Sequence, residues 1–331
     1  GGTGFIGTHL TNLLHEVHPE AKIYNLDIIE PGTPLPTVKN YKPALRKGEE
    51  HAATFIYCDV RQTIELEKVN ITPEDVIFNF AAVHRTPGHP DPAYFETNIR
   101  GAENVCAFAE RHGIRKIVFT SSIAPYGAAE ELKEETTLPT PNTPYGISKL
   151  VAEKIHVAWQ AGSPERQLTI VRPGVVFGRG ENGNFTRLYW GIRGHKFMYP
   201  GRKDTIKACI YVKELVRFML YRLEHHDSGV ELYNCCYEPA YTIEHIVESM
   251  KRVTNMKVKV PFMPGWLIMT AAGIAGALGS PMGICPARVR KLQISTNICG
   301  KKLAASGYRF RYTFEEALAD WYKDNGNLYL Q

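Results

Sequence analysis

The chain begins with glycines spaced three residues apart, and this spacing restricts its fold more than any other feature. The opening segment GGTGFIG contains a GxxGxxG pattern, and residues 8–14 continue with a helical pattern. Glycines let a backbone approach a pyrophosphate closely, and a helix N-terminus supplies N–H donors and a favourable dipole. The pattern therefore predicts a dinucleotide-binding turn. The residues expected to contact the dinucleotide here are Gly1, Gly4, Phe5, Ile6 and Gly7.

A carboxylate follows at the spacing that such a site requires. The run from Ile23 to Leu26 is a predicted strand, and it ends at Asp27, twenty residues after Gly7. A carboxylate there accepts hydrogen bonds from the adenosine ribose hydroxyls and repels a 2′-phosphate, which favours NAD over NADP. The alternative is that Asp27 is an ordinary helix or turn residue after a strand.

The strand that should precede the glycine turn is not in this sequence, because Gly1 is its first residue. In the doubly wound order 3-2-1-4-5-6 that strand lies in the middle of the sheet. A sheet without it would have two unpaired strand edges and a void in the core. We therefore expect the natural protein to have a short apolar segment before Gly1.

A hydroxyl-rich segment and a Tyr–Lys pair are candidates for proton-transfer chemistry. Ser122 follows the apolar run from Ile117 to Phe119, which is a predicted buried strand. Tyr145 and Lys149 stand at i and i+4, so a helix would place both side chains on one face. A neighbouring ammonium would lower the Tyr145 pKa from its ordinary value of ~10, as an acid/base catalyst needs. The same spacing also occurs by chance on surface helices.

Further segments fit a dinucleotide site. Residues 54–58 and 75–80 are predicted strands. Asp59 follows the first of them and is placed to meet the adenine amine. Ala81 and Ala82 follow the second, and their small side chains let the chain pass close to a dinucleotide. Helical patterns are predicted at residues 94–112, 145–159, 212–223, 243–253 and 313–324, with a frayed tail at 324–331.

In order along the chain, these motifs resemble the extended short-chain dehydrogenase/reductases. The resemblance is carried by GGTGFIG, Asp27, Asp59-Val60, FNFAA, TSSIAPYG, YGISK and VRPGVVFG, and is most specific through residue 178. The chain is most similar to the NAD-dependent epimerase/dehydratase branch that acts on nucleotide sugars. This resemblance implies NAD as the cofactor. It further implies Ser122, Tyr145 and Lys149 as catalytic residues, with Tyr145 the acid/base and Lys149 on the nicotinamide ribose. The implied cofactor contacts also include Asp59, Val60, Ala81, Ala82, Pro173 and Val176.

The resemblance also implies the architecture. It predicts an α/β fold with a Rossmann-type doubly wound parallel sheet, helices on both faces, and a smaller C-terminal substrate domain. Residues 1–178 are assigned to the NAD-binding domain and residues 179–331 mainly to the substrate domain. Some later segments are expected to return to the main sheet, and residues 229–234 are a predicted strand of this kind.

The residues after Ser122 help to choose among the reactions of this branch. Dehydratases place an Asp-Glu pair just after the catalytic hydroxyl, and decarboxylases carry a Glu at the position of Ala124, whereas this chain has Ile123-Ala124. We therefore predict epimerisation of a nucleotide-diphosphate sugar, of the 4-epimerase kind, by transient oxidation with tightly bound NAD. Two alternatives stay open. One is oxidation of an apolar alcohol, as in 3β-hydroxysteroid dehydrogenases, and the other is a non-catalytic NAD-binding regulator.

Several residues are candidates for substrate contacts. Lys207 stands where the family commonly has an Arg that binds the substrate diphosphate. A Lys can neutralise a phosphate but cannot make the planar two-pronged contact of an Arg. Asn184 either contacts a phosphate or sugar or caps a helix. His84 either contacts the substrate or is a loop residue without a role at the site. The expected substrate contacts are His84, Ser122, Asn184, Arg202, Lys207 and Arg288.

Composition limits the remaining partners. The net charge is +5 with scattered basic residues, which does not indicate nucleic acid binding. Seven cysteines without CxxC or zinc spacing predict reduced thiols in a cytoplasmic protein and no metal site. The apolar segment 264–278 is shorter than the ~20 residues that span a bilayer, so stable membrane insertion is not expected.

Two expectations concern surfaces. Segment 264–278 is predicted to be a buried or subunit-facing helix. The alternative is an apolar lid that admits a lipid-linked or steroid substrate or rests on a membrane. By family resemblance, a homodimer is expected through the helix at residues 145–159 and the helix after the fourth strand.

Overall fold

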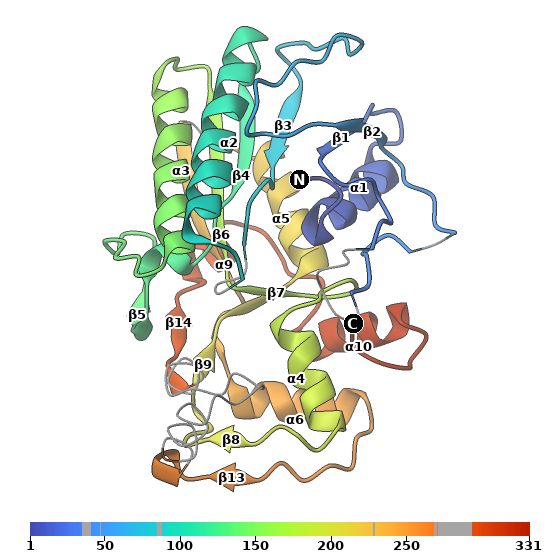
Figure 1. Cartoon of the computed structure of the whole chain (residues 1–331), viewed down its shortest axis with the longest axis vertical. Coiled ribbons are helices and arrows are strands. Elements are labelled where there is room, and N and C mark those ends of the chain that lie inside the picture. Colours follow the sequence, from blue (N-terminus) through green and yellow to red (C-terminus); the bar gives the residue numbers. More distant parts are fainter. Residues whose placement is uncertain (35–40, 47, 85–87, 228, 268–269, 271–292) are drawn as a thin grey trace.

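The computed structural model describes the chain apart from residues 35–40, 47, 85–87, 228, 268–269 and 271–292 (Figure 1). Its main sheet has four parallel strands in the order β11-β6-β4-β3, and β1 and β2 form a separate parallel pair. The α/β class predicted from the sequence is confirmed. The strand bounds are β1 Tyr24–Asp27, β2 Thr54–Tyr57, β3 Val76–Asn79, β4 Lys116–Thr120, β6 Gln167–Pro173 and β11 Val230–Cys235.

Gly1 lies between the two sheets. Its ammonium nitrogen donates to the carbonyl of Leu26 in β1 at 2.6 Å. A Cβ built on Gly1 would lie 2.6 Å from the backbone nitrogen of Ala81, just after β3. Within the described ranges, no strand pairs with both β1 and β3. The additional strand before Gly1 stays a prediction.

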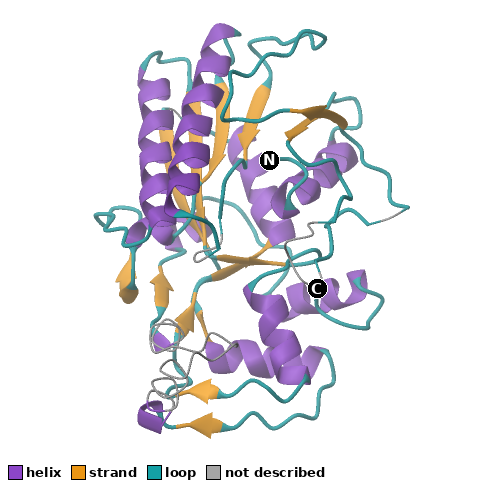
Figure 2. Ribbon diagram, in the orientation of Figure 1, coloured by secondary structure: helices purple, strands orange, loops and turns teal. Residues whose placement is uncertain are grey.

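Helices cover both faces of the main sheet (Figure 2). On one face, α2 and α3 pack over Ile117 and Phe119 of β4. On the other face, α5 packs over Val118, and α1 packs against α5. This division follows from the strand itself, because successive side chains point to opposite faces. The helix bounds are α1 Phe5–Val17, α2 Asp91–Arg111, α3 Pro144–Ala161 and α5 Val212–Glu224.

The C-terminal half adds a second core, built on stacked aromatic rings. The Phe177 ring stacks on Phe185 at a centroid distance of 4.8 Å, and it also contacts Phe314 and Trp321. The helices here are α4 Asn184–Arg193, α6 Ile243–Val253, α9 Lys301–Ala305 and α10 Phe314–Asp324. The short strands are β5 Ala129–Lys133, β7 Val175–Phe177, β8 Tyr199–Pro200, β9 Ile206–Lys207, β10 Cys209–Tyr211, β12 Tyr241–Thr242, β13 Phe262–Met263 and β14 Thr296–Ile298.

The chain returns to the main sheet after α5 and ends in the second core. The predicted strand at residues 229–234 is present as β11, which pairs in parallel with β6. The expectation of a frayed C-terminal tail is wrong, because Leu330 is fully buried in the aromatic cluster and Gln331 is buried as well. Segment 264–278 lies mostly outside the described residues. The domain boundary at residue 178 stays a prediction.

The aromatic cluster gives a test of the fold. Phe177→Ala should lower the free energy of unfolding by about 3–5 kcal/mol, because it removes a fully buried ring and leaves a cavity. The control is Leu138→Ala at a side chain that is 80% exposed, for which we expect a change below ~0.5 kcal/mol. Urea unfolding followed by circular dichroism measures both. Equal midpoints in the two variants would contradict the placement of Phe177.

Candidate active site

The glycine turn brings backbone atoms together too closely for side chains. A Cβ on Gly7 would lie 2.4 Å from the carbonyl oxygen of Gly2, and one on Gly2 would lie 2.2 Å from the Asn25 side chain. Gly4 is the N-cap of α1 and makes no side-chain capping bond. The first N–H groups of a helix have no intrahelical partner and favour an anion. The turn therefore has the geometry of a pyrophosphate site.

Asp27 is tied to this turn. Its Oδ2 accepts the backbone N–H of Thr3 at 3.0 Å, and its Oδ1 accepts the backbone N–H of Ile29 at 3.2 Å. Its Oδ2 lies 3.6 Å from the ammonium nitrogen of Gly1. The carboxylate thus stands at the end of β1 beside the turn, as the predicted ribose contact requires.

The other predicted cofactor residues also stand at or just beyond the carboxyl ends of parallel strands, where ligands bind in doubly wound sheets. Asp59 and Val60 follow β2, Ala81 and Ala82 follow β3, and Pro173 ends β6. Val176 differs, because it is the middle residue of the short strand β7. Asp59 forms an ion pair with Arg61 at 2.6 Å. Its predicted contact with adenine stays a prediction.

Helix α3 brings Tyr145 to Ser122. Its N-cap is Thr143, whose hydroxyl accepts the N–H of Gly146 at 3.1 Å. A Cβ on Gly146 would lie 2.7 Å from the carbonyl oxygen of Ala124, so the start of the helix packs directly on the segment after Ser122. Burial raises the pKa of the Tyr145 phenol, and its interaction with the Ser122 hydroxyl opposes this change.

Lys149 is buried one turn further along α3. Its Nζ donates to the carbonyl oxygen of Thr120 at 2.7 Å and lies 4.2 Å from the centre of the Phe119 ring. Burial lowers the pKa of Lys149 to about 7, and the negative charge of Glu153 acts in the opposite direction. The predicted effect of Lys149 on the Tyr145 pKa stays a prediction.

Two polar side chains outside the predicted site residues join α2 to α3. The Asn98 amide nitrogen donates to the Ser148 hydroxyl at 2.8 Å, and the Asn98 oxygen accepts the N–H of Val83 at 2.8 Å. Ser148 in turn donates to the carbonyl oxygen of Tyr145 at 2.9 Å. These bonds fix the loop after β3 against the helix that carries Tyr145. The signal for Ser148 was weak, because a Ser within a helical pattern usually indicates a solvent-facing position.

The predicted substrate contacts are more dispersed. Arg202 forms ion pairs with Asp204 at 2.9 Å and Glu130 at 3.0 Å. Lys207 in β9 donates to the carbonyl oxygen of Ile294 at 2.7 Å. Within the described part of the chain, the guanidinium of Arg202 donates hydrogen bonds to Asp204, Glu130 and the carbonyl oxygen of Gln293.

The remaining substrate candidates have separate outcomes. Asn184 is exposed, is the first residue of α4, and accepts a hydrogen bond from Arg187 at 2.7 Å. Its interpretation as an N-cap is wrong, because Gly183 holds that position. His84 is exposed, and Arg288 lies outside the described residues. The roles of these three residues at the substrate stay predictions.

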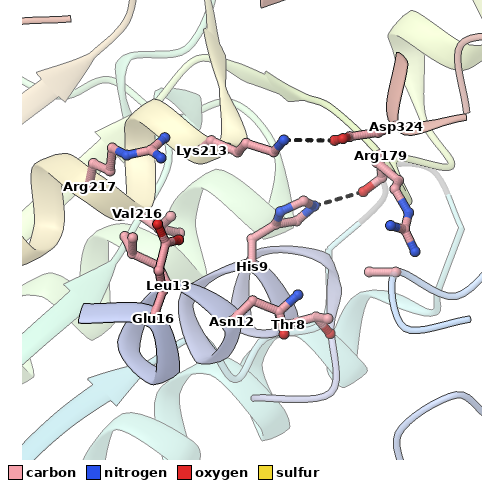
Figure 3. Close-up of a pocket in the computed structure, with 11 residues that line it drawn as sticks. Thr8, His9, Asn12, Leu13, Glu16, Arg179, Lys213, Val216, Arg217 and Asp324 are labelled. Atoms are coloured by element: carbon pink, nitrogen blue, oxygen red, sulfur yellow. Dashed lines mark hydrogen bonds and ion pairs between the residues drawn. The ribbon is translucent and has the colours of Figure 1, made fainter. Parts of the chain in front are cut away.

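A cavity of about 200 Å³ lies among α1, α5 and the end of α10, and Figure 3 shows its lining. His9 contacts the carbonyl oxygen of Arg179 at 2.8 Å, and Lys213 pairs with Asp324 at 2.8 Å. Burial lowers the pKa of His9 to about 4. The lining includes none of the three predicted catalytic residues, so this cavity is not the reaction site.

The described part of the chain contains no group of three or more His, Cys, Asp or Glu side chains able to hold a metal ion. Six cysteines within it are free thiols, among them the adjacent pair Cys235 and Cys236. None of its helices combines the length and apolarity needed to cross a membrane.

Residues 1–236 match the model of the NAD dependent epimerase/dehydratase family. The chain belongs to this family. It is 30% identical over 325 residues to the N-acetyl-alpha-D-glucosaminyl-diphospho-ditrans,octacis-undecaprenol 4-epimerase of Escherichia coli O157:H7, covering 96% of this chain and 91% of that protein. It is 32% identical over 296 residues to the UDP-glucose 4-epimerase of Lacticaseibacillus casei, covering 80% and 83%.

Solved structures share the fold of this family member. The UDP-N-acetylglucosamine 4-epimerase from Methanobrevibacter ruminantium M1 superposes with a TM-score of 0.73 at 22% identity, over 98% of this chain and 95% of that one. The UDP-glucuronic acid 4-epimerase from Bacillus cereus in complex with NAD gives 0.72 at 19% identity, over 98% and 97%. The family resemblance, the Rossmann-type fold and NAD as the cofactor are therefore confirmed.

The chain's own residues fit NAD. A Cβ on Gly4 would meet only the carbonyl oxygen of Gly1, at 3.4 Å, among the described atoms, so the approach to the N-terminus of α1 is open. Asp27 stands beside it to receive the ribose hydroxyls. Ser122, Tyr145 and Lys149 lie at the end of β4, where the nicotinamide half would be held.

The tight turn predicts a loss of cofactor binding in Gly7→Ala. The new methyl group would lie 2.4 Å from the carbonyl oxygen of Gly2, so the backbone must shift. We expect the Kd for NAD to rise about tenfold or more, measured by isothermal titration calorimetry. Gly191→Ala in α4 is the control, because its Cβ would meet Phe197 at 3.4 Å, an ordinary contact. The same Kd in both variants would contradict the assignment of the turn.

Proposed function

We propose that the protein is an NAD-dependent 4-epimerase of a nucleotide-diphosphate sugar. The observation that carries this proposal is the half-buried Tyr145 phenol, which interacts with the Ser122 hydroxyl and lies one helical turn from Lys149. These groups stand at the edge of the sheet that carries the cofactor residues. The relatives named above are 4-epimerases, and this supports inversion at carbon 4.

The residues divide the chemistry between them. Tyr145 takes the proton from the sugar hydroxyl while Ser122 holds the reacting oxygen, and Tyr145 later returns the proton after the sugar has presented its opposite face. NAD, when bound, accepts the hydride from the same carbon and gives it back. Because the hydride returns, product forms without net oxidation.

The two alternatives are not favoured. A dehydrogenase of an apolar alcohol would use the same three residues, but the relatives named above are epimerases. A non-catalytic regulator has no need for a buried ammonium one helical turn from a phenol, and burying that charge costs stability.

The proposal includes a homodimer formed through α2 and α3 and a cytoplasmic location. Ile147 and Val151 stand one turn apart on α3 and are 39% and 36% exposed. Apolar side chains at that spacing form a stripe suited to a helical interface. Size-exclusion chromatography with light scattering tests the oligomeric state.

Tyr145→Phe tests the function. Removing the hydroxyl should lower turnover at least ~100-fold while the Kd for NAD changes less than about twofold, because general acid–base catalysis contributes that much and the ring still fills the site. The assay incubates UDP-, GDP- and dTDP-sugars with the enzyme and follows sugar identity by chromatography and NADH by absorbance. Tyr24→Phe, at an exposed tyrosine of β1, is the control. Full turnover in Tyr145→Phe would remove its acid/base role, and NADH formed in proportion to product would favour the dehydrogenase.

A second candidate is the same reaction on a sugar carried by a polyprenyl diphosphate. Of the two relatives above, the one that acts on such a substrate covers more of this chain. Phe262, Trp266 and Leu267 are 51%, 72% and 42% exposed. A Cβ on Gly201 would lie 2.9 Å from Gly265, so these two glycines are in close contact. Arg202 follows the first glycine in the sequence, and Trp266 follows the second. An apolar surface thus stands beside a predicted diphosphate contact.

The second candidate predicts a selective loss in the double variant Trp266→Ser and Leu267→Ser. Conversion of undecaprenyl-diphospho-N-acetylglucosamine in detergent should fall about tenfold, since each buried apolar side chain contributes about 1.5–3 kcal/mol. Conversion of UDP-N-acetylglucosamine should stay unchanged. Leu328→Ser, at another exposed leucine, is the control. Wild-type enzyme that converts only the UDP-sugar would reject this candidate.

A further inference from the structure

A buried ion pair lies behind Lys149 and is not part of the predicted catalytic set. Arg172 in β6 and Glu153 in α3 are almost fully buried, and they make two parallel bonds, Nε to Oε1 at 2.8 Å and Nη2 to Oε2 at 2.6 Å. The Ser121 hydroxyl donates to the same Oε1 at 2.5 Å. A planar two-pronged pair of this kind holds a carboxylate in one orientation. Its position beside the site therefore requires an explanation beyond stability, because a buried ion pair by itself is weak evidence of stabilisation.

The pair belongs to a regular set of contacts between α3 and the end of β4. Residues 145, 149 and 153 lie on one face of α3, one turn apart. Tyr145 contacts Ser122, Lys149 contacts the carbonyl oxygen of Thr120, and Glu153 contacts Ser121. Three consecutive strand-end residues are thus held by three successive turns of one helix. Movement of Glu153 would disturb both Lys149 and Ser122.

The charges around Lys149 give Glu153 a second effect. The carboxylate of Glu153 opposes the lowering of the Lys149 pKa by burial. His156, on the next turn, is neutral near pH 7 because burial lowers its pKa to about 4. Burial also favours the neutral form of Tyr145. The main sheet contributes the charged side chain of Arg172, which forms an ion pair with Glu153.

We propose that Glu153, clamped by Arg172 and Ser121, is a positioning residue that keeps Lys149 charged and in place beside Tyr145. Its effect on turnover rests on the proposed epimerase function, whereas its effect on the charge of Lys149 does not. Glu153 contacts neither the sugar nor NAD in this role and acts through Lys149. The two effects are therefore measured separately.

The test compares Glu153→Gln with Glu231→Gln. Glu231 is a matched control, because it forms an equally buried two-pronged pair with Arg222, with bonds of 2.5 and 3.0 Å between β11 and α5. The protonation of Lys149 is followed by ¹³C NMR of lysines labelled at the ε-carbon, with Lys149→Met used to assign the signal. We expect the titration midpoint of Lys149 to fall by about one pH unit or more in Glu153→Gln, a tenfold change in its proton affinity. In Glu231→Gln it should stay at the wild-type value.

The activity profile should follow the same direction. The ammonium is lost as pH rises, so the alkaline limb of kcat/KM should move to lower pH in Glu153→Gln, and the loss relative to wild type should be larger at pH 8 than at pH 6. A merely structural role would lower kcat/KM equally at all pH values. An unchanged Lys149 midpoint in Glu153→Gln overturns the proposal. If wild-type protein converts no sugar, the proposed function fails while the NMR titration still decides this inference.

A second variant covers the case in which Glu153→Gln does not fold. Glu153→Asp keeps the charge but withdraws the carboxylate by one methylene from Arg172 and Ser121. The Lys149 midpoint should then move in the same direction by a smaller amount, and kcat should fall while the Kd for NAD changes little. A midpoint and a kcat both equal to those of wild type would overturn the proposal.

Discussion

The burial of one ammonium group determines how the centre of this molecule is arranged. Lys149 is 2% exposed, and a buried charge costs several kcal/mol unless it is paired and hydrogen-bonded. The carbonyl oxygen of Thr120 and the nearby carboxylate of Glu153 meet this requirement. Both partners are correctly placed only if α3 lies directly over the end of β4. The close approach of Gly146 to Ala124 is the steric consequence.

The sheet topology then decides what can meet this helix. The strands β3, β4 and β6 are parallel neighbours, so their carboxyl ends lie at the same edge of the sheet. The glycine turn and Asp27 belong to the separate pair β1 and β2, yet Gly1 lies against the end of β3. A dinucleotide held at the turn would extend along this edge towards Ser122 and Tyr145. The predicted cofactor residues and the predicted proton-transfer residues are therefore expected to share one edge of the fold.

Local patterns could be predicted from the sequence, and distant pairings could not. Each feature identified from the sequence belongs to a single turn or a single helix. These features are the glycine spacing, Asp27 and the Tyr145–Lys149 spacing. Arg172 and Glu153 are separated by 19 residues and meet only because β6 and α3 pack together. An i, i+4 Lys–Glu spacing within a helix is also typical of a solvent-exposed pair. An Arg within the buried strand at residues 167–173 was the one available signal that a carboxylate lies opposite.

The same reasoning explains the error at the C-terminus. The tail was expected to fray because it is short and follows a helix, but Leu330 inserts into a cluster of aromatic rings contributed by residues far away in the sequence. The substrate contact of Arg202 stays a prediction, and in this structure two carboxylates pair with that side chain. Binding of a diphosphate by Arg202 would have to replace both ion pairs. Surface pairs of this kind contribute only about 0–1 kcal/mol each, so such an exchange is energetically feasible.

The charge balance on α3 links the buried pair to the chemistry. Burial favours the neutral form of both Tyr145 and Lys149. Moving one proton from the phenol to the amine creates two charges but leaves the net charge of the site unchanged. Glu153 lies one turn from Lys149 and two turns from Tyr145, so its negative charge stabilises the ammonium more than it destabilises the phenolate. The pair with Arg172 keeps that negative charge in the interior, and the charge of Glu153 thereby opposes the effect of burial on the Lys149 pKa.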